Sequence, residues 1–328
     1  MKAIVYTKYG SPEVLNFQDV EKPAPEDHEV LVRVQAASIN FPDWGLLRGK
    51  PFVVRMMTGG LLKPKNNILG ADIAGRVEAV GRNAEQFQPG DEVFGDISAC
   101  GFGGFAEYVS VPENALASKP SRATFEEAAA APMTAVVALQ ALRDKGHIQP
   151  GQKVLIHGAS GGIGSFAVQI AKSFDTEVTG VCSTRNIELV RSIGAERVID
   201  YTKEDFARND QRYDLILAAA GYRSIFDYRS ALNPEGIYVM AGGAMAQIFQ
   251  CMLLGPWISM TGSRKMVNLS SKPKQDDLVF IKKLIDDGKV RPVIDRRYPF
   301  QEIPDALRYY GEGHTRGKVV ITVDQLRD

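Results

Sequence analysis

The chain has little cysteine and no excess of either charge. Its three cysteines, Cys100, Cys182 and Cys251, are far apart and odd in number, and none forms a C-x-x-C pair. This argues against a disulfide framework or a cysteine-rich zinc lobe, and it is typical of a reducing compartment. Because 39 basic residues balance 39 acidic ones, nothing indicates a nucleic-acid partner or an acidic membrane partner.

The chain also lacks a long apolar run. No leader-type run occurs in the opening "MKAIVYTKYG", so we expect a cytoplasmic protein. The longest apolar stretch, "IFQCMLLGPWISM" at 248–260, is interrupted by Gln, Gly and Pro. It is shorter than the roughly 20 apolar residues that a membrane span needs. We interpret it as a buried core segment or a subunit interface.

Two domains are expected, because 328 residues exceed what one hydrophobic core usually supports. The first 120 residues contain short strand patterns such as "EVLVRVQA", with apolar residues at every second position. From Lys153 onward, strands such as "KVLIH" alternate with amphipathic helices such as "GIGSFAVQIAKSF". That alternation predicts an α/β domain with a parallel sheet covered on both faces.

The boundaries follow from the changes in pattern. An alanine-rich helical segment begins near residue 121, and Pro132 is expected to divide it into two helices. The closing "KVVITV" is a strand, and its pairing with the N-terminal strands would make the first domain discontinuous. We therefore predict one domain of residues 1–122 and 290–328, and a second of residues 123–289.

A glycine-rich turn, "HGASGGIG", follows the strand "KVLI" and opens a helix. Gly158 permits a sharp turn, Gly161 permits close approach of a pyrophosphate, and Gly164 permits helix–sheet packing. Such turns also occur without a ligand, but the flanking strand and helix favour dinucleotide binding. The backbone N–H groups predicted to hold the phosphates belong to Ser160, Gly161, Gly162 and Ile163.

The end of the next strand indicates which nucleotide is bound. An acid at this point would bind the ribose 2′-hydroxyl of NAD, but the segment "VCSTRN" contains none. Ser183 and the guanidinium of Arg185 suit a 2′-phosphate, and Tyr201 could add a phenolic donor at the same edge. We therefore predict NADPH as the cofactor. The alternative is that Arg185 is an ordinary solvated charge.

Several motifs in order resemble the medium-chain dehydrogenase/reductase superfamily, specifically its zinc-free quinone oxidoreductase branch, which includes the reticulon-4-interacting homologues. They include "AASINFPDWGLLRG", "ILGADIAGRVEAVG", "GGFAEYVSVP", "VLIHGASGGIG" and "GHTRGKVVITV". The resemblance covers nearly the whole chain. It implies a Rossmann doubly wound cofactor domain and a β-rich GroES-like domain.

The resemblance also shows where this chain departs from its zinc-dependent relatives. Those relatives take ligands from the segment matching "SINFPD", from a G-H-E segment and from the start of the helical linker. Here the first segment has Asn40, the second has Ala71 and Asp72, and the third reads "APMTA". A catalytic zinc needs about three protein ligands, so we expect no metal. Without a Lewis acid, conjugated acceptors suit the site better than simple alcohols.

Three residues of the segment that matches the family's active site are the catalytic candidates. The Asn40 amide could donate to the developing oxyanion, or it could cap local backbone in a turn. Asp43 is a capping acid or a proton-transfer group, with capping favoured. Trp44 could line the substrate pocket, or it could pack in the core.

The resemblance places three further residues beside the nicotinamide. Thr134 begins the helix near the nicotinamide ribose, and Gly242 and Gly243 form the turn that approaches the ring. The long loop 48–67 is the expected lid over the substrate. Its apolar lining would come from Phe52, Met56 and Met57.

The predicted function is hydride transfer from NADPH to a quinone, an enone or another activated alkene, without metal. A metal-independent reductase of activated carbonyls is one alternative, and a non-catalytic NADPH-binding sensor or partner-binding protein is another. The expected partners are a small apolar conjugated substrate and, by resemblance, a second subunit in a homodimer. No nucleic acid or membrane partner is expected.

Overall fold

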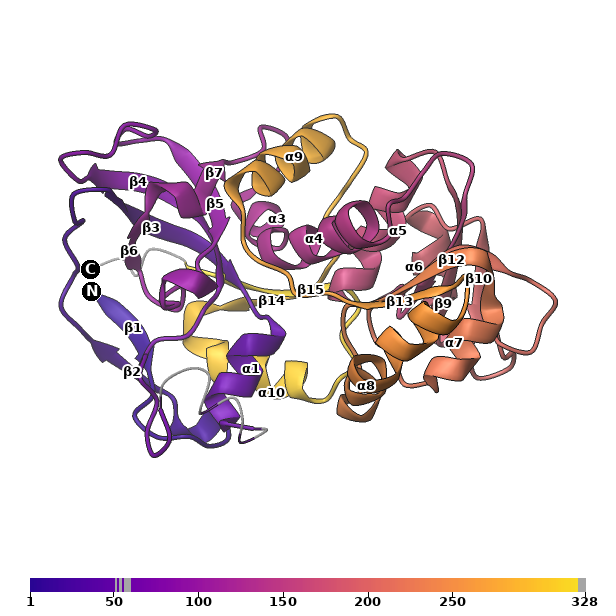
Figure 1. The fold of residues 1–328 in the computed structure, drawn as a ribbon. Helices are drawn as coiled ribbons and strands as arrows, with labels where there is room; N and C mark the ends of the chain where they lie inside the picture. Colours follow the sequence, from indigo (N-terminus) through magenta and orange to yellow (C-terminus); the bar gives the residue numbers. More distant parts are fainter. Residues whose placement is uncertain (51, 53–54, 56–59, 324–328) are drawn as a thin grey trace. The chain divides into compact units, whose positions relative to one another are not determined.

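The computed structural model describes residues 1–50, 52, 55 and 60–323 (Figure 1). The chain divides into two compact units, and the second contains Thr134–Lys272 and Gly288–Arg291. The first unit contains the rest, including Met1–Met133 and Pro273–Asp287. The sequence-based boundaries differ from this division at 290–291, which belong to the second unit, and at 123–133 and 273–287, which belong to the first. These segments join the first unit because α3 (Phe125–Ala129) packs on its sheet and α9 (Gln275–Asp286) packs on its strand β7.

The second unit contains a six-stranded parallel sheet. The first three strands in chain order occupy successive positions from the centre of the sheet to one edge. The fourth strand lies beside the first, and the last two continue to the opposite edge. This order is that of a doubly wound dinucleotide fold and confirms the prediction. In sheet order the strands are β10 (Arg197–Asp200), β9 (Glu177–Cys182), β8 (Lys153–His157), β11 (Tyr213–Ala218), β12 (Leu232–Met240) and β13 (Lys265–Asn268).

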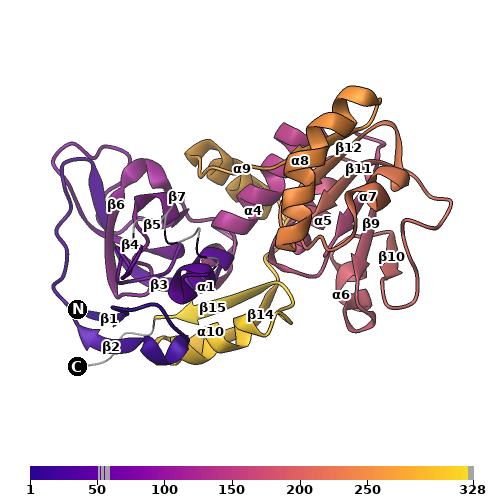
Figure 2. The ribbon, with the colours of Figure 1, turned by 60° about the horizontal axis from the view of Figure 1, so that its bottom comes forward.

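Helices surround this sheet (Figure 2). Phe166, Ala167 and Ile170 of α5 are fully buried, as the helical spacing predicts. Pro132 begins a separate helix after α3, which confirms that the alanine-rich segment is divided. The helices are α4 (Pro132–Leu139), a π-helical turn (Gln140–Lys145), α5 (Gly162–Ser173), α6 (Ile187–Ser192), α7 (Ile225–Ala231) and α8 (Met245–Thr261).

The first unit contains a seven-stranded, mostly antiparallel sheet and a separate pair of strands, β1 (Lys2–Val5) and β2 (Asn16–Asp19). The closing strand β15 pairs antiparallel with β3, with Val320 opposite Ser38, as expected. The sheet strands are β14 (Ile294–Pro299), β15 (Lys318–Thr322), β3 (Glu29–Ser38), β4 (Asp72–Val80), β5 (Glu92–Asp96) and β7 (Leu116–Ser118), with β6 (Tyr108–Pro112) paired to β3.

Two helices of the first unit were not predicted. They are α1 (Phe41–Arg48) and α10 (Ile303–Gly311), which contact each other. Buried residues of both join the core formed by the sheet. Short 3-10 turns complete the unit at Pro12–Val14, Ser98–Cys100, Glu113–Ala115 and Phe300–Glu302, and one more, Thr184–Asn186, lies in the second unit.

The apolar stretch 248–260 lies within α8. One side of this helix is buried, through Cys251 and Ile258, but the other side is exposed. The exposed apolar residues are Phe249, Met252, Leu253, Trp257 and Met260. Among the described helices, none is long and apolar enough to cross a membrane.

Candidate cofactor site and active site

The glycine turn (Gly158–Gly164) lies between the carboxyl end of β8 and the start of α5. Gly158 has a φ of +86°, a conformation that L side chains rarely adopt. At Gly164 a Cβ atom would lie 2.0 Å from the Gly158 carbonyl oxygen, so only glycine lets the helix lie this close to the strand. The sequence therefore predicted both the place and the geometry of this turn.

The turn has room for a ligand on one side. A Cβ atom at Gly161 would meet no heavy atom closer than the Gly158 carbonyl oxygen at 3.6 Å. The first N–H groups of α5, including those of Gly162 and Ile163, have no partner within the helix because of helix geometry. Open space beside free N–H donors and the positive end of a helix dipole fits a pyrophosphate.

The residues predicted for the ribose phosphate meet at the end of β9. Ser183 is half-buried, Arg185 is exposed, and Tyr201 is 43% exposed. The Tyr201 N–H donates to the Cys182 carbonyl at 3.1 Å, so the two strand ends lie side by side. Solvent-facing donors at one edge are what a 2′-phosphate requires.

Sequence reasoning missed Asn186, which joins the two halves of this site. Its Nδ2 donates to Ser160 Oγ at 2.9 Å and to Ser183 Oγ at 3.2 Å. Its Oδ1 is buried and has no hydrogen-bond partner among the described residues. A buried, unused acceptor beside the predicted nucleotide contacts fits a ligand that carries hydroxyl groups.

A carboxylate also lies at this edge, although the segment "VCSTRN" at the end of β9 has none. Asp200, at the end of β10, accepts a hydrogen bond from Thr184 Oγ1 at 2.6 Å. Its other oxygen accepts from the N–H and hydroxyl of Thr202. These hydrogen bonds, first the one from Thr184, hold the pKa of Asp200 below its usual value. Its oxygens are therefore committed to organising the loop.

The glycines predicted beside the nicotinamide lie at the end of β12. Gly243 has a φ of +144°, and a Cβ atom there would lie 2.2 Å from the Gly221 carbonyl oxygen. The Gly242 N–H donates to the Ala218 carbonyl at 3.0 Å, which ties this turn to the end of β11. Thr134 is buried near the start of α4.

In the first unit, Asn40 and Asp43 lie at the start of α1. Asp43 Oδ2 accepts from the Asn40 N–H at 2.8 Å, and Oδ1 accepts from the Gly70 N–H at 2.9 Å. The first bond is the helix-capping contact of the capping alternative, and the second ties α1 to Gly70, so each oxygen of Asp43 accepts from a backbone N–H. Complete burial raises the pKa of Asp43 to about 7, although the two N–H donors oppose that shift.

Trp44 is half-buried and packs with the core of the first unit. A Cβ atom at Gly311 of α10 would lie 2.4 Å from the indole ring, so α10 needs a glycine at this contact. The Arg48 guanidinium lies 5.0 Å from the ring centroid. Packing accounts for these contacts, and a pocket role for Trp44 remains a prediction.

A buried polar cluster (Ser38, Asn40, Asp72 and Lys318) lies next to α1 and was not predicted. Lys318 is 2% exposed, and its ammonium contacts both Asn40 Oδ1 and Asp72 Oδ2. Nothing in the local pattern "RGKVVITV" distinguishes this lysine from a strand-end lysine in solvent. Within the described residues, no three His, Cys, Asp or Glu side chains gather to hold a metal ion.

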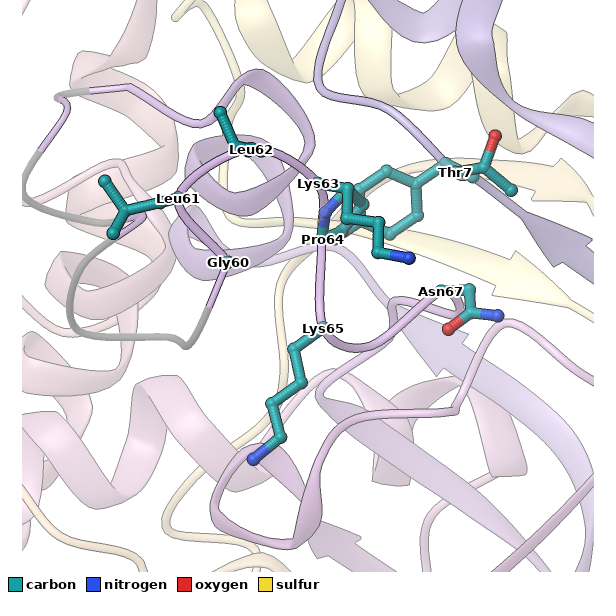
Figure 3. A pocket seen from close by; sticks show the side chains of 9 residues that line it. Thr7, Gly60, Leu61, Leu62, Lys63, Pro64, Lys65 and Asn67 are labelled. Atoms are coloured by element: carbon teal, nitrogen blue, oxygen red, sulfur yellow. The ribbon is translucent and has the colours of Figure 1, made fainter.

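The predicted substrate loop is described only in part. Met56 and Met57 lie outside the described residues, and Phe52 is 57% exposed. The second half of this loop forms a cavity of about 600 Å³ with Tyr6 and Thr7 (Figure 3). The cavity is lined there by Gly60, Leu61, Leu62, Lys63, Pro64, Lys65 and Asn67.

Two family models match the chain. The alcohol dehydrogenase GroES-like domain matches residues 26–121, and the zinc-binding dehydrogenase model matches residues 193–321. The first match covers the antiparallel region of the first unit. The second begins within the parallel-sheet unit and ends in the closing strand of the first unit.

Known proteins match along almost the whole chain. The human mitochondrial NAD(P)H oxidoreductase RTN4IP1 is 33% identical, over 98% of this chain and 89% of its own. The NADPH-dependent alkenal/one oxidoreductase of Arabidopsis thaliana chloroplasts is 32% identical, over 98% and 79%. The solved quinone oxidoreductase from Coxiella burnetii has a TM-score of 0.87 at 29% identity, over 99% of both chains. This chain therefore belongs to the quinone oxidoreductase branch of the medium-chain dehydrogenase/reductase superfamily, a family of nicotinamide-dependent oxidoreductases.

Proposed function

We propose that the chain transfers a hydride from NADPH to a conjugated acceptor, such as a quinone, an enone or an activated alkene. The observation that carries this proposal is the glycine turn, with its open side at Gly161 and the first N–H groups of α5, which have no partner within the helix. The similarity to a quinone oxidoreductase and to an alkenal/one oxidoreductase supports the acceptor class. The nicotinamide supplies the hydride, and the chain orients the reactants and keeps out water.

The preference for NADPH over NADH rests on the end of β9. Ser183, Arg185 and Tyr201 offer donors at this edge, and the oxygens of the neighbouring Asp200 are already bonded within the loop. In Arg185→Ala we expect binding of NADPH to weaken by about 1.5–3 kcal/mol, as for a charge-assisted contact. Binding of NADH should change little. Titrations that show equal losses for both nucleotides would remove the 2′-phosphate argument.

Hydrogen-bond donors can stabilise the acceptor oxygen without a metal ion. As the acceptor carbon takes the hydride, negative charge spreads to its carbonyl oxygen, and a preorganised donor lowers that barrier. We assign this donor to Asn40. One amide hydrogen is bonded to Asp72 Oδ2 at 2.9 Å, and among the described residues the other has only a long contact, 3.4 Å, with the Ser38 carbonyl.

The activity test uses the full chain, NADPH and a panel of quinones, enones, activated carbonyls and simple alcohols, all with EDTA present. We expect turnover of quinones or enones, and saturated ketones as the products of enones. Allylic alcohol as the product would instead identify a carbonyl reductase. Tight NADPH binding with no turnover of any acceptor would identify a non-catalytic nucleotide-binding protein.

We also propose that two copies pair through the exposed face of α8. This face carries Leu253, which is 76% exposed, and Trp257, which is 58% exposed, and α8 contains no charged residue. The edge strand β13 follows α8, and among the described strands it has a neighbour, β12, on one side only. Light scattering should give a dimer for the wild type and a monomer for Leu253→Asp. A monomeric wild type at micromolar concentration would contradict the proposal.

A further inference from the structure

The first unit buries one ammonium group where four separate segments meet. Lys318 begins β15, Asp72 begins β4, Ser38 ends β3, and Asn40 precedes α1 (Figure 1). Lys318, Asp72 and Asn40 are each at most 2% exposed. Burying an ammonium and a carboxylate is costly even when the two are paired. A buried ion pair is therefore weak evidence of a purely stabilising role.

The hydrogen bonds of this cluster leave the Asn40 amide a single orientation. Lys318 Nζ donates to Asn40 Oδ1, and Asn40 Nδ2 donates to Asp72 Oδ2 at 2.9 Å. Turning the amide over would place its NH₂ against the ammonium and its oxygen against the carboxylate. Both contacts would then be repulsive, so the cation and the anion fix which edge of Asn40 donates, together with the capping contact that the Asn40 side chain accepts from the Asp43 N–H.

The same ammonium balances the charge of Asp72. Lys318 Nζ lies 3.4 Å from Asp72 Oδ2, and the same oxygen accepts from Ser38 Oγ at 3.1 Å. The other oxygen of Asp72 accepts from the Met133 N–H at 2.9 Å. Burial raises the pKa of Asp72, and the charge of Lys318 is the largest influence that opposes this rise. Without Lys318, the acceptor for the Asn40 amide would lose its counter-ion.

We propose that Lys318 is a positioning residue for hydride transfer, because its buried ammonium holds the Asn40 carboxamide in its donating orientation. The inference rests on the proposed function, in which Asn40 contacts the acceptor oxygen. Lys318 acts through Asn40 and Asp72, and it contacts neither substrate nor cofactor in this role. The second amide hydrogen of Asn40 has only its long contact to Ser38 within the described part of the chain, and it is the one held in place for the acceptor.

The test uses Lys318→Met, Lys318→Arg and the double variant Lys318→Met/Asp72→Asn. The double variant removes both charges, so it avoids the unpaired buried carboxylate that could unfold Lys318→Met. Lys2→Met is the matched control, because Lys2 forms an exposed ion pair with Asp19. Thermal unfolding, NADPH affinity, kcat and KM with a quinone are measured for each full-length protein.

We expect the double variant to unfold near the wild-type temperature and to bind NADPH within about twofold of it. Its kcat should fall 10- to 100-fold with little change in KM, and Lys318→Arg should recover part of the loss. In an Asn40→Ala background, Lys318→Met should lower kcat no further. A folded double variant with wild-type kcat would overturn the proposal. So would an Asn40→Ala/Lys318→Met variant in which the fold-losses of kcat from the two single substitutions multiply, because the two residues would then act independently.

A second readout does not depend on turnover. The side-chain NH₂ resonances of Asn40, assigned by comparison with Asn40→Ala, should shift and broaden in the double variant and stay unchanged in Lys2→Met. Unchanged resonances would overturn the positioning role. A wild type that reduces no acceptor would refute the proposed function, and this measurement would still decide whether Lys318 orients Asn40.

Discussion

The glycine turn of the second unit lies within seven consecutive residues, whereas the buried polar cluster of the first unit joins Asn40 to Lys318 across 278 positions. In the turn the groups predicted to face a ligand are backbone N–H groups, and the glycine spacing arranges them. In the cluster the groups are side chains, and three strands and a helix must fold before they meet. A short segment can therefore specify the first site, but only the whole fold specifies the second.

The largest expected effect comes from separating the members of the cluster. Asp72→Ala leaves Lys318 buried without its carboxylate, so we expect the free energy of unfolding to fall by about 3–5 kcal/mol. Asp19→Ala is the matched control, because Asp19 pairs with Lys2 at an exposed site, and it should cost far less stability than Asp72→Ala. Urea denaturation measures both. Equal losses of unfolding free energy in the two variants would mean that burial of the Lys318–Asp72 pair does not increase the cost of breaking it.

The sequence predicted the features that a short segment specifies and missed most of those that distant residues form together. The strand β8, the helix α5 and the turn between them were predicted, since their signals lie within a few residues. The pairing of β15 with β3 was also expected. The helix α1 was missed because it is short and contains Pro42 and Gly45, which weaken any helical pattern.

The candidate site shows this limit at particular residues. Lys318 was missed because its partner Asp72 lies 246 positions away, and a lysine before an apolar strand resembles an exposed strand end. Asn186 was missed, although it lies one residue after Arg185, because its role depends on contact with Ser160 in another loop. Packing contacts and buried acceptors are set by tertiary structure, so the local pattern carries no sign of them.

The next prediction tests whether residues of the glycine turn itself determine nucleotide binding. Gly164→Val places side-chain carbon against the Gly158 carbonyl, where even a Cβ atom would lie at 2.0 Å. We expect a stability loss of about 3 kcal/mol and a loss of NADPH affinity of more than 100-fold.

Gly161→Ala is the control for that variant. Gly161 has a φ of −84°, which alanine adopts freely, and its nearest contact is 3.6 Å away. Its stability should change by less than about 1 kcal/mol, while the new methyl group enters the space for the pyrophosphate and lowers NADPH affinity about tenfold. Unchanged affinity would place the nucleotide elsewhere.

A third effect is the pH dependence of the first unit. Burial, followed by the charge of Asp72, raises the pKa of Asp96 to about 7. Between about pH 4 and 7 the unfolded chain is ionised at this residue while the folded chain keeps the proton, so stability falls as pH rises. Asp96→Asn keeps an acceptor for the Ser98 N–H and removes this titration.

The measurement compares the unfolding free energies at pH 5 and pH 7.5. We expect the decrease across this range to be smaller in Asp96→Asn by roughly 2 kcal/mol. Part of the decrease should remain, because the pKa of Asp43 is also raised to about 7. An identical decrease in both proteins would show that Asp96 ionises normally in the folded state.

The smallest predicted effect concerns Asn186, which lies outside the glycine turn but bonds to Ser160 within it. It tests whether the turn also depends on a residue from another loop. Asn186→Ala removes the donor that joins Ser160 of the glycine turn to Ser183 at the end of β9. Loss of these bonds should weaken nucleotide binding by about 1 kcal/mol, or about fivefold. Because Ser160 belongs to the turn predicted to hold the pyrophosphate, which both nucleotides carry, Asn186→Ala should weaken the binding of NADH as well as NADPH, in contrast to Arg185→Ala. Calorimetric titration of both variants with both nucleotides separates a residue that shapes the site from one that reads the 2′-phosphate, and a loss confined to NADPH in Asn186→Ala would assign Asn186 to the phosphate itself.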